Sequence, residues 1–326
     1  MFGLLNIDKP PGCSSRQVVD CVDWLIQPLR SGHAGTLDPL ATGVLVVCIG
    51  QATRLIPYVQ QQPKRYTATF LLGRTSESDD TERAVTELPS APRPTAAELA
   101  ALLPQFTGTI QQQPPAFSAL KVRGRRAYKL ARRGHAVDLA PRDVVVHELR
   151  IVRYEYPELV LDLACSAGTY VRALGRDLAR AAGTEAVMSA LVRTAVGDFV
   201  LSQAVPLASL NRETLPQHLL SPLTALSALP KVVVSEEQLA SLGRGQTIEL
   251  PADFGRQREP AEVSELQKRA EPIDESAIVV PSGPTEAIEP GEMAAVDAQG
   301  RLRAILVPRG LGHYGPSRNF AVDDAV

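Results

Sequence analysis

The chain switches irregularly between segments with the period of a β-strand and segments with the period of a helix. Residues 44–49 (VLVVCI) form a short, β-branched apolar run, and residues 65–72 (RYTATFLL) form a second strand-like segment. Residues 144–154 and 159–165 predict a pair of strands joined by a turn at Pro157. Because helical patterns fall between these strands without a regular β-α-β alternation, the sequence predicts an α+β fold.

Helix starts are indicated by three capping boxes, in which a hydroxyl residue stands three positions before Gln or Glu. They are Ser14 before Gln17, Thr95 before Glu98, and Ser235 before Gln238. Residues 169–182 then mix apolar and charged residues at helical spacing, and Gly183 is a natural C-terminal cap. The sequence therefore predicts at least four helices among the strands.

The last third of the chain has a different character. Residues 231–234 and 292–309 predict short strands, the second stretch turning at residues 298–300. Between them, residues 251–290 hold six prolines and nine acidic residues with few large apolar side chains. Such a segment buries too little surface to offset its ordering entropy, so we expect a disordered insertion. The predicted domains are residues 1–226 and 227–326, the second interrupted at 251–290.

Composition excludes several classes of protein. The chain of 326 residues is 44% hydrophobic and 21% charged, as in ordinary globular proteins, and its longest apolar run is too short to cross a membrane. Its N-terminus does not read as a signal peptide, so we expect a cytoplasmic protein. The four cysteines are scattered without metal-ligand spacing, which predicts neither a disulfide framework nor a metal site.

A carboxylate stands in an unusual place at Asp38, between a glycine-bearing loop and the apolar run, with Pro39 after it. A residue before proline is biased toward extended geometry, so Asp38 is expected on an extended loop. Phosphate-binding glycine motifs and the nucleophile elbow of serine hydrolases are missing from the sequence. On local pattern alone, Asp38 fits a turn as well as a catalytic role, and His33 fits a structural histidine.

Residues 117–137 (FSALKVRGRRAYKLARRGHAV) contain seven Lys or Arg residues and no acid. Such runs are commonly solvated surface, but a basic run interrupted by glycine and bearing aromatic residues also suits a phosphate backbone. From residue 251 onward, by contrast, there are 13 acidic and 8 basic residues. The positive charge is thus concentrated in the first part of the chain.

Several blocks of sequence occur in an order typical of one enzyme family. They are residues 3–15 (GLLNIDKPPGCSS), 32–45 (GHAGTLDPLATGVL), 64–66 (KRY), 112–134 (QQPPAFSALKVRGRRAYKLARRG) and 165–172 (CSAGTYVR), followed by Leu191 and Arg193 as L-x-R. Together they closely resemble the TruB-type tRNA pseudouridine synthases, with Ser14 in place of the usual threonine. The resemblance implies a mixed-sheet pseudouridine synthase catalytic domain.

The resemblance also implies roles for individual residues. Asp38 matches the catalytic aspartate of the family, and Arg172 matches its ion-pair partner. Tyr66 would stack on the target uracil and act late in the reaction, while Tyr170 and Leu191 would complete the pocket. Members of the family convert uridine 55 in the T-loop of transfer RNA into pseudouridine without a metal or other cofactor. Attack of the aspartate on C1′ and a glycal route both remain open.

RNA contacts follow from the same resemblance. His33 would fill the space left in the loop when the target base is everted, and Lys9 is expected to contact substrate. The basic insert at about residues 104–140 would contact phosphates, with Lys121 and Arg132 as its candidate ligands. The expected partner is the T-stem-loop of transfer RNA, bound by a monomer that needs no protein partner and no membrane.

Residues 229–245 and 296–320 resemble, more loosely, the small β-rich PUA-like RNA-binding domain that follows the catalytic domain in many members. The acidic segment 251–290 departs from that pattern, and we expect it to be dispensable for chemistry. Two other functions remain open. One is a guide-RNA-dependent synthase within a ribonucleoprotein, and the other is a non-catalytic protein that helps transfer RNA to fold.

Overall fold

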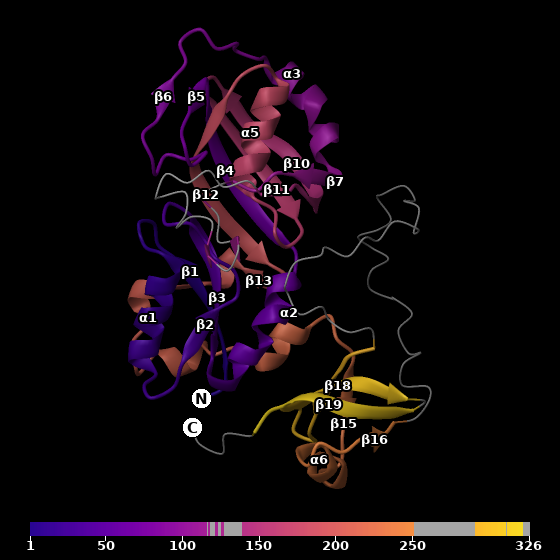
Figure 1. Cartoon of the computed structure of the whole chain (residues 1–326). Helices are drawn as coiled ribbons and strands as arrows, with labels where there is room; N and C mark the ends of the chain where they lie inside the picture. Colours follow the sequence, from indigo (N-terminus) through magenta and orange to yellow (C-terminus); the bar gives the residue numbers. More distant parts are fainter. Residues whose placement is uncertain are drawn as a thin grey trace. The chain divides into compact units, whose positions relative to one another are not determined.

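The computed structural model describes residues 1–115, 117, 121–122, 125–126, 139–250, 291–310 and 312–321. The chain forms two compact units, Leu4–Leu220 and Ser221–Val326, the latter together with Met1–Gly3. Figure 1 shows the course of the chain through both units. The predicted acidic insertion at 251–290 lies outside the described residues, as does most of the basic run at 117–137.

Ten strands of the described residues form the sheet of the larger unit. They are β1 (Gly3–Lys9), β2 (Ser31–His33), β3 (Thr42–Ile49), β4 (Lys64–Leu72), β7 (Gly108–Gln112), β10 (Arg142–Glu155), β11 (Glu158–Cys165), β12 (Ala186–Val196), β13 (Phe199–Val200) and β14 (Val205–Pro206). The main path runs β14-β1-β3-β12-β4-β11-β10-β7, with β13 beside β12 and β2 beside β3. The sheet is mixed, because β1 with β14 and β3 with β12 are parallel whereas β4, β7, β10 and β11 pair antiparallel.

Helices and short ladders complete this unit. The helices are α1 (Ser15–Leu25), α2 (Ile56–Gln61), α3 (Ala96–Leu102) and α5 (Val171–Ala181), with 3₁₀ turns η1 (Gly50–Leu55), η2 (Leu103–Phe106), η3 (Leu201–Gln203), η4 (Leu207–Ser209) and η5 (Leu215–His218). Two-stranded ladders join β5 (Arg74–Thr75) to β6 (Thr86–Glu87) and β8 (Lys121–Val122) to β9 (Arg125–Arg126). No helix among the described residues is long and apolar enough to cross a membrane.

The predicted capping boxes are confirmed. At the start of α1, the Ser14 hydroxyl accepts from the Gln17 backbone at 3.2 Å, and the Gln17 side chain accepts from the Ser14 backbone at 2.8 Å. Thr95 and Glu98 form the same reciprocal pair at α3. Each box supplies acceptors for backbone N–H groups that the first turn of a helix leaves unpaired, which sets the starting residue.

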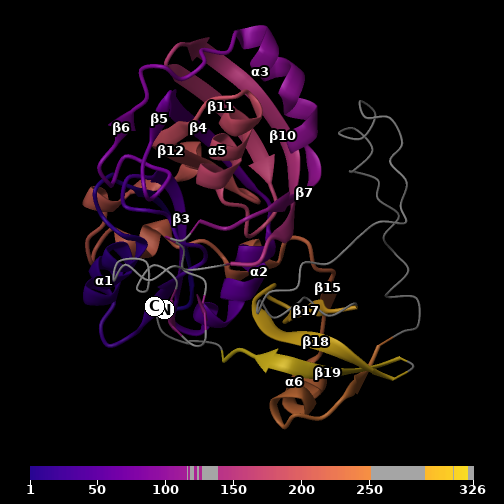
Figure 2. The ribbon, with the colours of Figure 1, turned by 45° about the horizontal axis from the view of Figure 1, so that its top comes forward.

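One face of strands β4, β11 and β12 carries the main apolar core. Phe70, Leu161 and Met188 come from the sheet, and Leu99 of α3 with Leu174 of α5 cover them. Figures 1 and 2 show both helices on this side of the sheet. Because side chains alternate along a strand, the same face also carries Tyr66 and Leu191.

Helix α5 lies unusually close to strand β4. A Cβ atom at Gly175 would stand 2.0 Å from the ring of Phe70, far inside van der Waals contact. The helix therefore reaches this distance from the sheet only because residue 175 has no side chain. This approach matters for the site, because Arg172 projects from the same helix one turn earlier.

The C-terminal unit contains a separate five-stranded sheet in the order β15-β17-β18-β19-β16. Its elements are η6 (Pro222–Leu226), β15 (Lys231–Val233), α6 (Glu236–Gly243), β16 (Ile248–Glu249), β17 (Met293–Val296), β18 (Leu302–Gly310) and β19 (His313–Asn319). Val232, Leu242, Ile248, Met293 and Leu306 are among the side chains of its own core. The predicted strands around residues 298–300 and the capping box at Ser235 are confirmed.

Candidate active site

Asp38 lies on the loop between β2 and β3, as its position before proline predicted. The loop is fixed on its N-terminal side by Ser15 of α1, whose hydroxyl accepts from the Leu37 backbone at 2.8 Å and donates to its carbonyl at 3.0 Å. On the other side, the Ala41 backbone donates to the Asp38 carbonyl at 3.0 Å. The carboxylate is thus presented by a loop whose backbone is held at both ends.

Lys9 also holds the loop that carries Asp38. Its side chain is 0% exposed, and its ammonium donates to the carbonyls of Pro10 at 3.0 Å, Pro39 at 3.3 Å and Ala41 at 2.6 Å. Burial lowers the pKa of Lys9, and the nearby carboxylate of Asp38 opposes that shift. The sequence predicted contact with substrate, whereas this placement favours a role in positioning the Asp38 loop.

Replacing Lys9 with Met removes all three hydrogen bonds while keeping the length of the side chain. We expect the free energy of unfolding to fall by about 2 kcal/mol, because buried carbonyls are left without donors. Single-turnover rates should fall while the dissociation constant for RNA stays within about threefold. Urea denaturation and RNA-binding titrations of Lys9→Met measure both, with the exposed Lys231→Met as control. Equal effects from the two variants would contradict the positioning role.

Arg172 brings two carboxylates together. Its Nη2 atom lies 3.1 Å from Asp38 Oδ2, and its Nη1 atom lies 3.2 Å from Asp80 Oδ2. The guanidinium also donates to the carbonyls of Ser78 at 2.7 Å and Phe117 at 3.0 Å. Arg172 and Asp80 are 6% and 3% exposed, whereas the Asp38 side chain is 34% exposed. Only the Asp38 end of this network is therefore open to a substrate.

Asp80 is held in turn by the loop that follows β5. Its Oδ1 atom accepts from the Ser78 hydroxyl at 2.5 Å and from the Glu82 backbone at 3.0 Å. Glu82 reaches back to the Asp38 loop, accepting from the Leu40 backbone at 2.8 Å. Asp38 and Asp80 are therefore connected twice, once through Arg172 and once through hydrogen bonds to backbone groups. Both connections hold the carboxylates in place.

Electrostatics at Asp38 act in opposite directions. Burial raises the pKa of the Asp38 carboxyl, and the charge of Asp80 raises it further. The Arg172 guanidinium opposes both effects through its charge and its hydrogen bond. The result is a carboxylate with a raised pKa that has one fixed cationic partner. Such a group can act as a nucleophile or as a base.

Tyr66 and Leu191 lie on neighbouring strands of the central sheet. In the register of β4 with β12, Tyr66 is opposite Arg193 and Ala68 is opposite Leu191. Tyr66 packs against the main core, and Leu191 belongs to it. Burial raises the pKa of the Tyr66 phenol, and the Arg193 guanidinium lowers it by charge and by hydrogen bonding. The charge of Asp38 raises the pKa of the Tyr66 phenol as well.

Tyr170 caps the start of α5. Gln112 is buried and clamps the backbone of Tyr170, accepting from its N–H at 2.7 Å and donating to its carbonyl at 3.0 Å. The Tyr170 ring lies against the Arg142 guanidinium, 4.9 Å from ring centre to Cζ. Since Arg172 follows in the first turn, Gln112 indirectly sets the position of the residue that pairs with Asp38. The helix begins at Val171 rather than at the predicted residue 169.

The remaining predicted residues have less defined surroundings. His33 is half-buried at the end of β2, five positions before Asp38 on the same segment. The backbone of Lys121 lies in β8, and its side chain is outside the described part of the chain. Arg132 is also outside the described residues. The structure thus brings together Asp38 and Arg172 directly.

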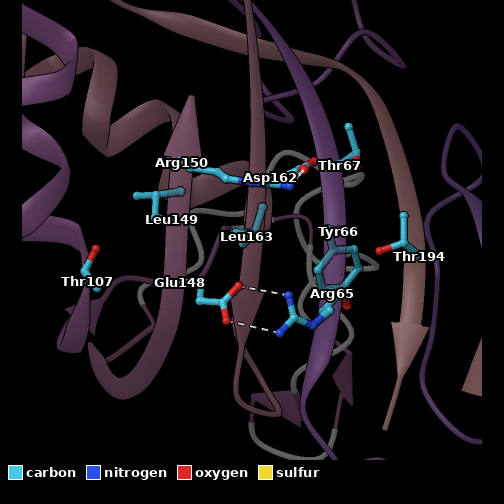
Figure 3. Close-up of a pocket in the computed structure, with 10 residues that line it drawn as sticks. All are labelled: Arg65, Tyr66, Thr67, Thr107, Glu148, Leu149, Arg150, Asp162, Leu163 and Thr194. Carbon is cyan, nitrogen blue, oxygen red and sulfur yellow. Dashed lines mark hydrogen bonds and ion pairs between the residues drawn. The ribbon is translucent and has the colours of Figure 1, made fainter. Parts of the chain in front are cut away.

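A cavity of about 530 Å³ lies over β10, β11 and β4, and Tyr66 is among the residues that line it. Figure 3 shows that its charged side chains pair with one another. Arg65 donates to Glu148 at 2.9 and 3.1 Å, and Asp162 accepts from Arg150 at 2.7 Å and from Thr67 at 2.6 Å. Thr67 alternates with Tyr66 along β4, so these charges point away from the face that carries Tyr66. We assign this cavity no catalytic role.

Three site residues escaped sequence reasoning. Asp80 had no signal beyond a cluster of acidic residues at 79–82, while Gln112 and Arg193 lie inside the matched blocks but were assigned no role. All three act through partners far away in sequence, which local patterns do not reveal. Among the described residues, no group of His, Cys, Asp or Glu has the arrangement of a metal site.

Comparison with known proteins supplies the family. A profile described as TruB family pseudouridylate synthase, N-terminal domain, matches residues 24–171. A protein named tRNA pseudouridine synthase B from Rhodopseudomonas palustris is 44% identical over 259 residues, covering 76% of this chain and 70% of that protein. The protein of the same name from Gluconacetobacter diazotrophicus is 41% identical over 260 residues, covering 78% and 85%.

Solved structures show the same fold at lower identity. A chain of a Cbf5–Nop10–Gar1 complex matches with a TM-score of 0.65 and 22% identity, covering 95% of this chain and 79% of that one. A chain of an H/ACA RNP bound to a substrate RNA containing 2′-deoxyuridine matches with a TM-score of 0.66 and 20% identity, covering 99% and 86%. From its identity to these bacterial relatives over most of both chains, and from the matching profile, the chain belongs to the TruB family of pseudouridylate synthases.

Proposed function

We propose that this protein is a stand-alone tRNA pseudouridine synthase that isomerises the uridine at position 55 of the T-loop. The observation that carries the proposal is the partly exposed Asp38 carboxylate, held 3.1 Å from the buried Arg172 guanidinium. The names of the bacterial relatives support transfer RNA as the substrate. A protein that only bound RNA would gain nothing from a carboxylate, which repels phosphate.

The isomerisation requires breaking the bond between N1 of uracil and C1′ of ribose, turning the base, and joining C5 to C1′. Asp38 is the group that starts this sequence, either by attack on C1′ or by removal of a proton from C2′. Arg172 keeps the carboxylate ionised and aimed. Since Asp80 also engages Arg172, the guanidinium has a fixed orientation before substrate arrives, and little reorganisation is needed during the reaction.

The target base must leave its stack before it can reach Asp38, at a cost of about a few kcal/mol. Stacking on an aromatic ring returns about 1–3 kcal/mol per base, and Tyr66 is proposed to supply that ring. Leu191, on the same face of the sheet, and Tyr170 would close the pocket around the base. His33 would occupy the space that the everted nucleotide leaves in the T-loop.

Other parts of the chain are proposed to hold the RNA outside the pocket. Lys121 and Arg132 of the basic insert would contact phosphates. We propose that residues 227–326 form a PUA-like RNA-binding domain after a catalytic domain at 1–226, and that the segment 251–290 is dispensable for chemistry. The support for the PUA-like assignment is the separate five-stranded sheet with its own core and the sequence likeness noted above.

Release of tritium from a transfer RNA transcript labelled at C5 of uridine tests the proposal. The purified protein should release tritium from the bare transcript without guide RNA or cofactor, and a transcript with cytidine at position 55 should release none. Release that depends on an added guide RNA would instead indicate a ribonucleoprotein enzyme. Tight binding without release would indicate a protein that assists tRNA folding.

Activity should depend on pH through Asp38. Because burial raises the pKa of this carboxyl above its ordinary value of 3.8, the protonated and inactive form persists to a higher pH than for an exposed aspartate. We expect the single-turnover rate to fall as pH drops, with a midpoint above 3.8. Arg172→Met should shift that midpoint upward, because the opposing cation is lost. A rate that is flat down to the ordinary value would count against Asp38 as the titrating group.

A further inference from the structure

Arg193 is a buried cation whose presence in the core of the larger unit needs an explanation. Its residue is 2% exposed, among the largest fully enclosed side chains of the molecule. Among the ion pairs of the described residues, none includes Arg193. Burying a charge without a carboxylate partner is costly, so such a residue is retained for the contacts that it makes.

The contacts of Arg193 lie between the Asp38 loop and Tyr66. The Arg193 Nε atom donates to the carbonyl of Val44 in β3 at 2.7 Å, and its Nη2 atom donates to the carbonyl of Gly35 at 3.1 Å. Gly35 stands three residues before Asp38 on the loop that presents the carboxylate. In the other direction, Arg193 is the cross-strand partner of Tyr66, so the two side chains leave the same face of the sheet.

The chemistry of guanidinium determines what it does to Tyr66. A guanidinium only donates hydrogen bonds, so the Tyr66 oxygen must accept from it, and the phenolic proton is left to point elsewhere. The positive charge of Arg193 also lowers the pKa of the Tyr66 phenol, against the effect of burial. Burial lowers the pKa of Lys9 and of Lys64, and the positive charge of Arg193 lowers both further.

The backbone around Arg193 is built to allow this arrangement. Gly43, its partner on β3, has a φ of +92°, and a Cβ atom there would lie 2.3 Å from the Arg193 carbonyl oxygen. A side chain at residue 43 would therefore push β3 away from β12 and move the Asp38 loop away from Arg193. The contact between the two strands is close because residue 43 is glycine.

We propose that Arg193 is a positioning residue, which holds the Tyr66 hydroxyl and the Gly35 end of the Asp38 loop in a fixed relation. The Arg193 side chain thereby fixes the distance between the Tyr66 ring, which is proposed to stack on uracil, and the Asp38 carboxylate, which is proposed to start the reaction. This inference rests on the proposed roles of Tyr66 and Asp38. In this scheme Arg193 does not touch the substrate. It acts through Tyr66 and through the Asp38 loop.

Fluorine NMR tests the proposal without RNA. All seven tyrosines are replaced by 3-fluorotyrosine, and the Tyr66 resonance is assigned by its loss in Tyr66→Phe. In Arg193→Met, we expect the titration midpoint of residue 66 to rise, because the cation that favours the ionised phenol is gone. Arg193→Gln should raise it similarly, and Arg193→Lys should raise it less. These two variants decide the question if Arg193→Met does not fold.

Arg65→Met is the matched control. Arg65 precedes Tyr66 on β4, but its side chain points to the other face of the sheet and pairs with Glu148 (Figure 3). We expect it to leave the Tyr66 midpoint in place. A midpoint that is unchanged in the Arg193 variants, or that moves equally in Arg65→Met, would overturn the proposal.

Kinetics complete the test on the active enzyme. Arg193→Gln should lower the single-turnover rate about tenfold, while the dissociation constant for the transcript changes less than about threefold. If Arg193 only stabilised the fold, its replacement would lower the fraction of folded protein without changing the titration midpoint of Tyr66. If the wild type released no tritium, the proposed function would fail, yet the NMR titration would still decide the contact of Arg193 with Tyr66.

Discussion

Asp38→Asn is expected to abolish pseudouridine formation while leaving tRNA binding within about threefold of the wild type. The amide keeps the shape of the side chain and can still accept from Arg172, but it is neither a nucleophile nor a base at neutral pH. Loss of the group that starts a reaction costs on the order of 10⁴-fold or more in turnover. Tritium release in single-turnover conditions measures the rate, and filter binding measures the affinity.

The loss should not come from unfolding. Burial raises the pKa of Asp38, which means that the folded state disfavours its charge, and Asn removes that charge. Arg172 keeps its contacts with Asp80 and with two carbonyls. Asp20→Asn, at an exposed carboxylate paired with Arg16 on α1, is the matched control and should retain full activity. Turnover of Asp38→Asn above about 1% of the wild-type rate would rule out the assigned role.

Arg172→Met is expected to impair both stability and activity. It leaves Asp80, which is 3% exposed, as a buried carboxylate without its cation, and it removes the donors to Ser78 and Phe117. Breaking a buried ion pair on one side costs about 3–5 kcal/mol of folding free energy. The turnover of the fraction that remains folded should fall on the order of 10²–10³-fold, because Asp38 is no longer aimed.

Arg172→Lys should lie between Arg172→Met and the wild type, because an ammonium retains the charge but cannot bridge two carboxylates with separate nitrogens. Arg180→Met is the control on the same helix. Arg180 pairs with Glu185 at 3.0 Å but is 53% exposed, so its loss should change stability by less than about 1 kcal/mol. Urea denaturation gives the stabilities. Similar losses of unfolding free energy in Arg172→Met and Arg180→Met would show that the buried ion pairs of Arg172 stabilise the fold no more than an exposed pair does.

Local sequence patterns predicted helices α1, α3, α5 and α6 and strands β3, β4, β10, β11, β15, β17 and β18, but not the other strands. The capping boxes at Ser14, Thr95 and Ser235 mark real helix starts, and the β-branched run at 44–49 lies in β3. Such signals are short-range, because a cap or a period depends on residues within one or two turns. Strands β1, β12 and β19 were not anticipated. β1 pairs with β14 and β12 pairs with β3 and β4, which lie far away in sequence, and a single chain carries no local mark for such pairing. β19 instead forms a hairpin with the preceding β18.

For the candidate site, too, the sequence predicted some features and left others to the tertiary structure. The order of matched blocks predicted that Asp38, Tyr66 and Arg172 form one site, although they stand on separate elements of the larger unit, and the structure pairs Asp38 with Arg172. What those blocks could not show is what each residue contacts. Lys9, for example, was expected at the substrate, and its ammonium instead binds three carbonyls around the Asp38 loop.

By itself, the sequence determined the family, the α+β class and the three helix starts that carry capping boxes, and it predicted Asp38 as the catalytic carboxylate, since each of these depends on residue types at short or ordered spacing. Only the tertiary structure decided that Asp80 shares Arg172 with Asp38, that Gln112 clamps the backbone of Tyr170, and that Arg193 donates to Gly35 on the Asp38 loop. Pair distances and burial set the pKa of each group, and these exist only after the chain has folded.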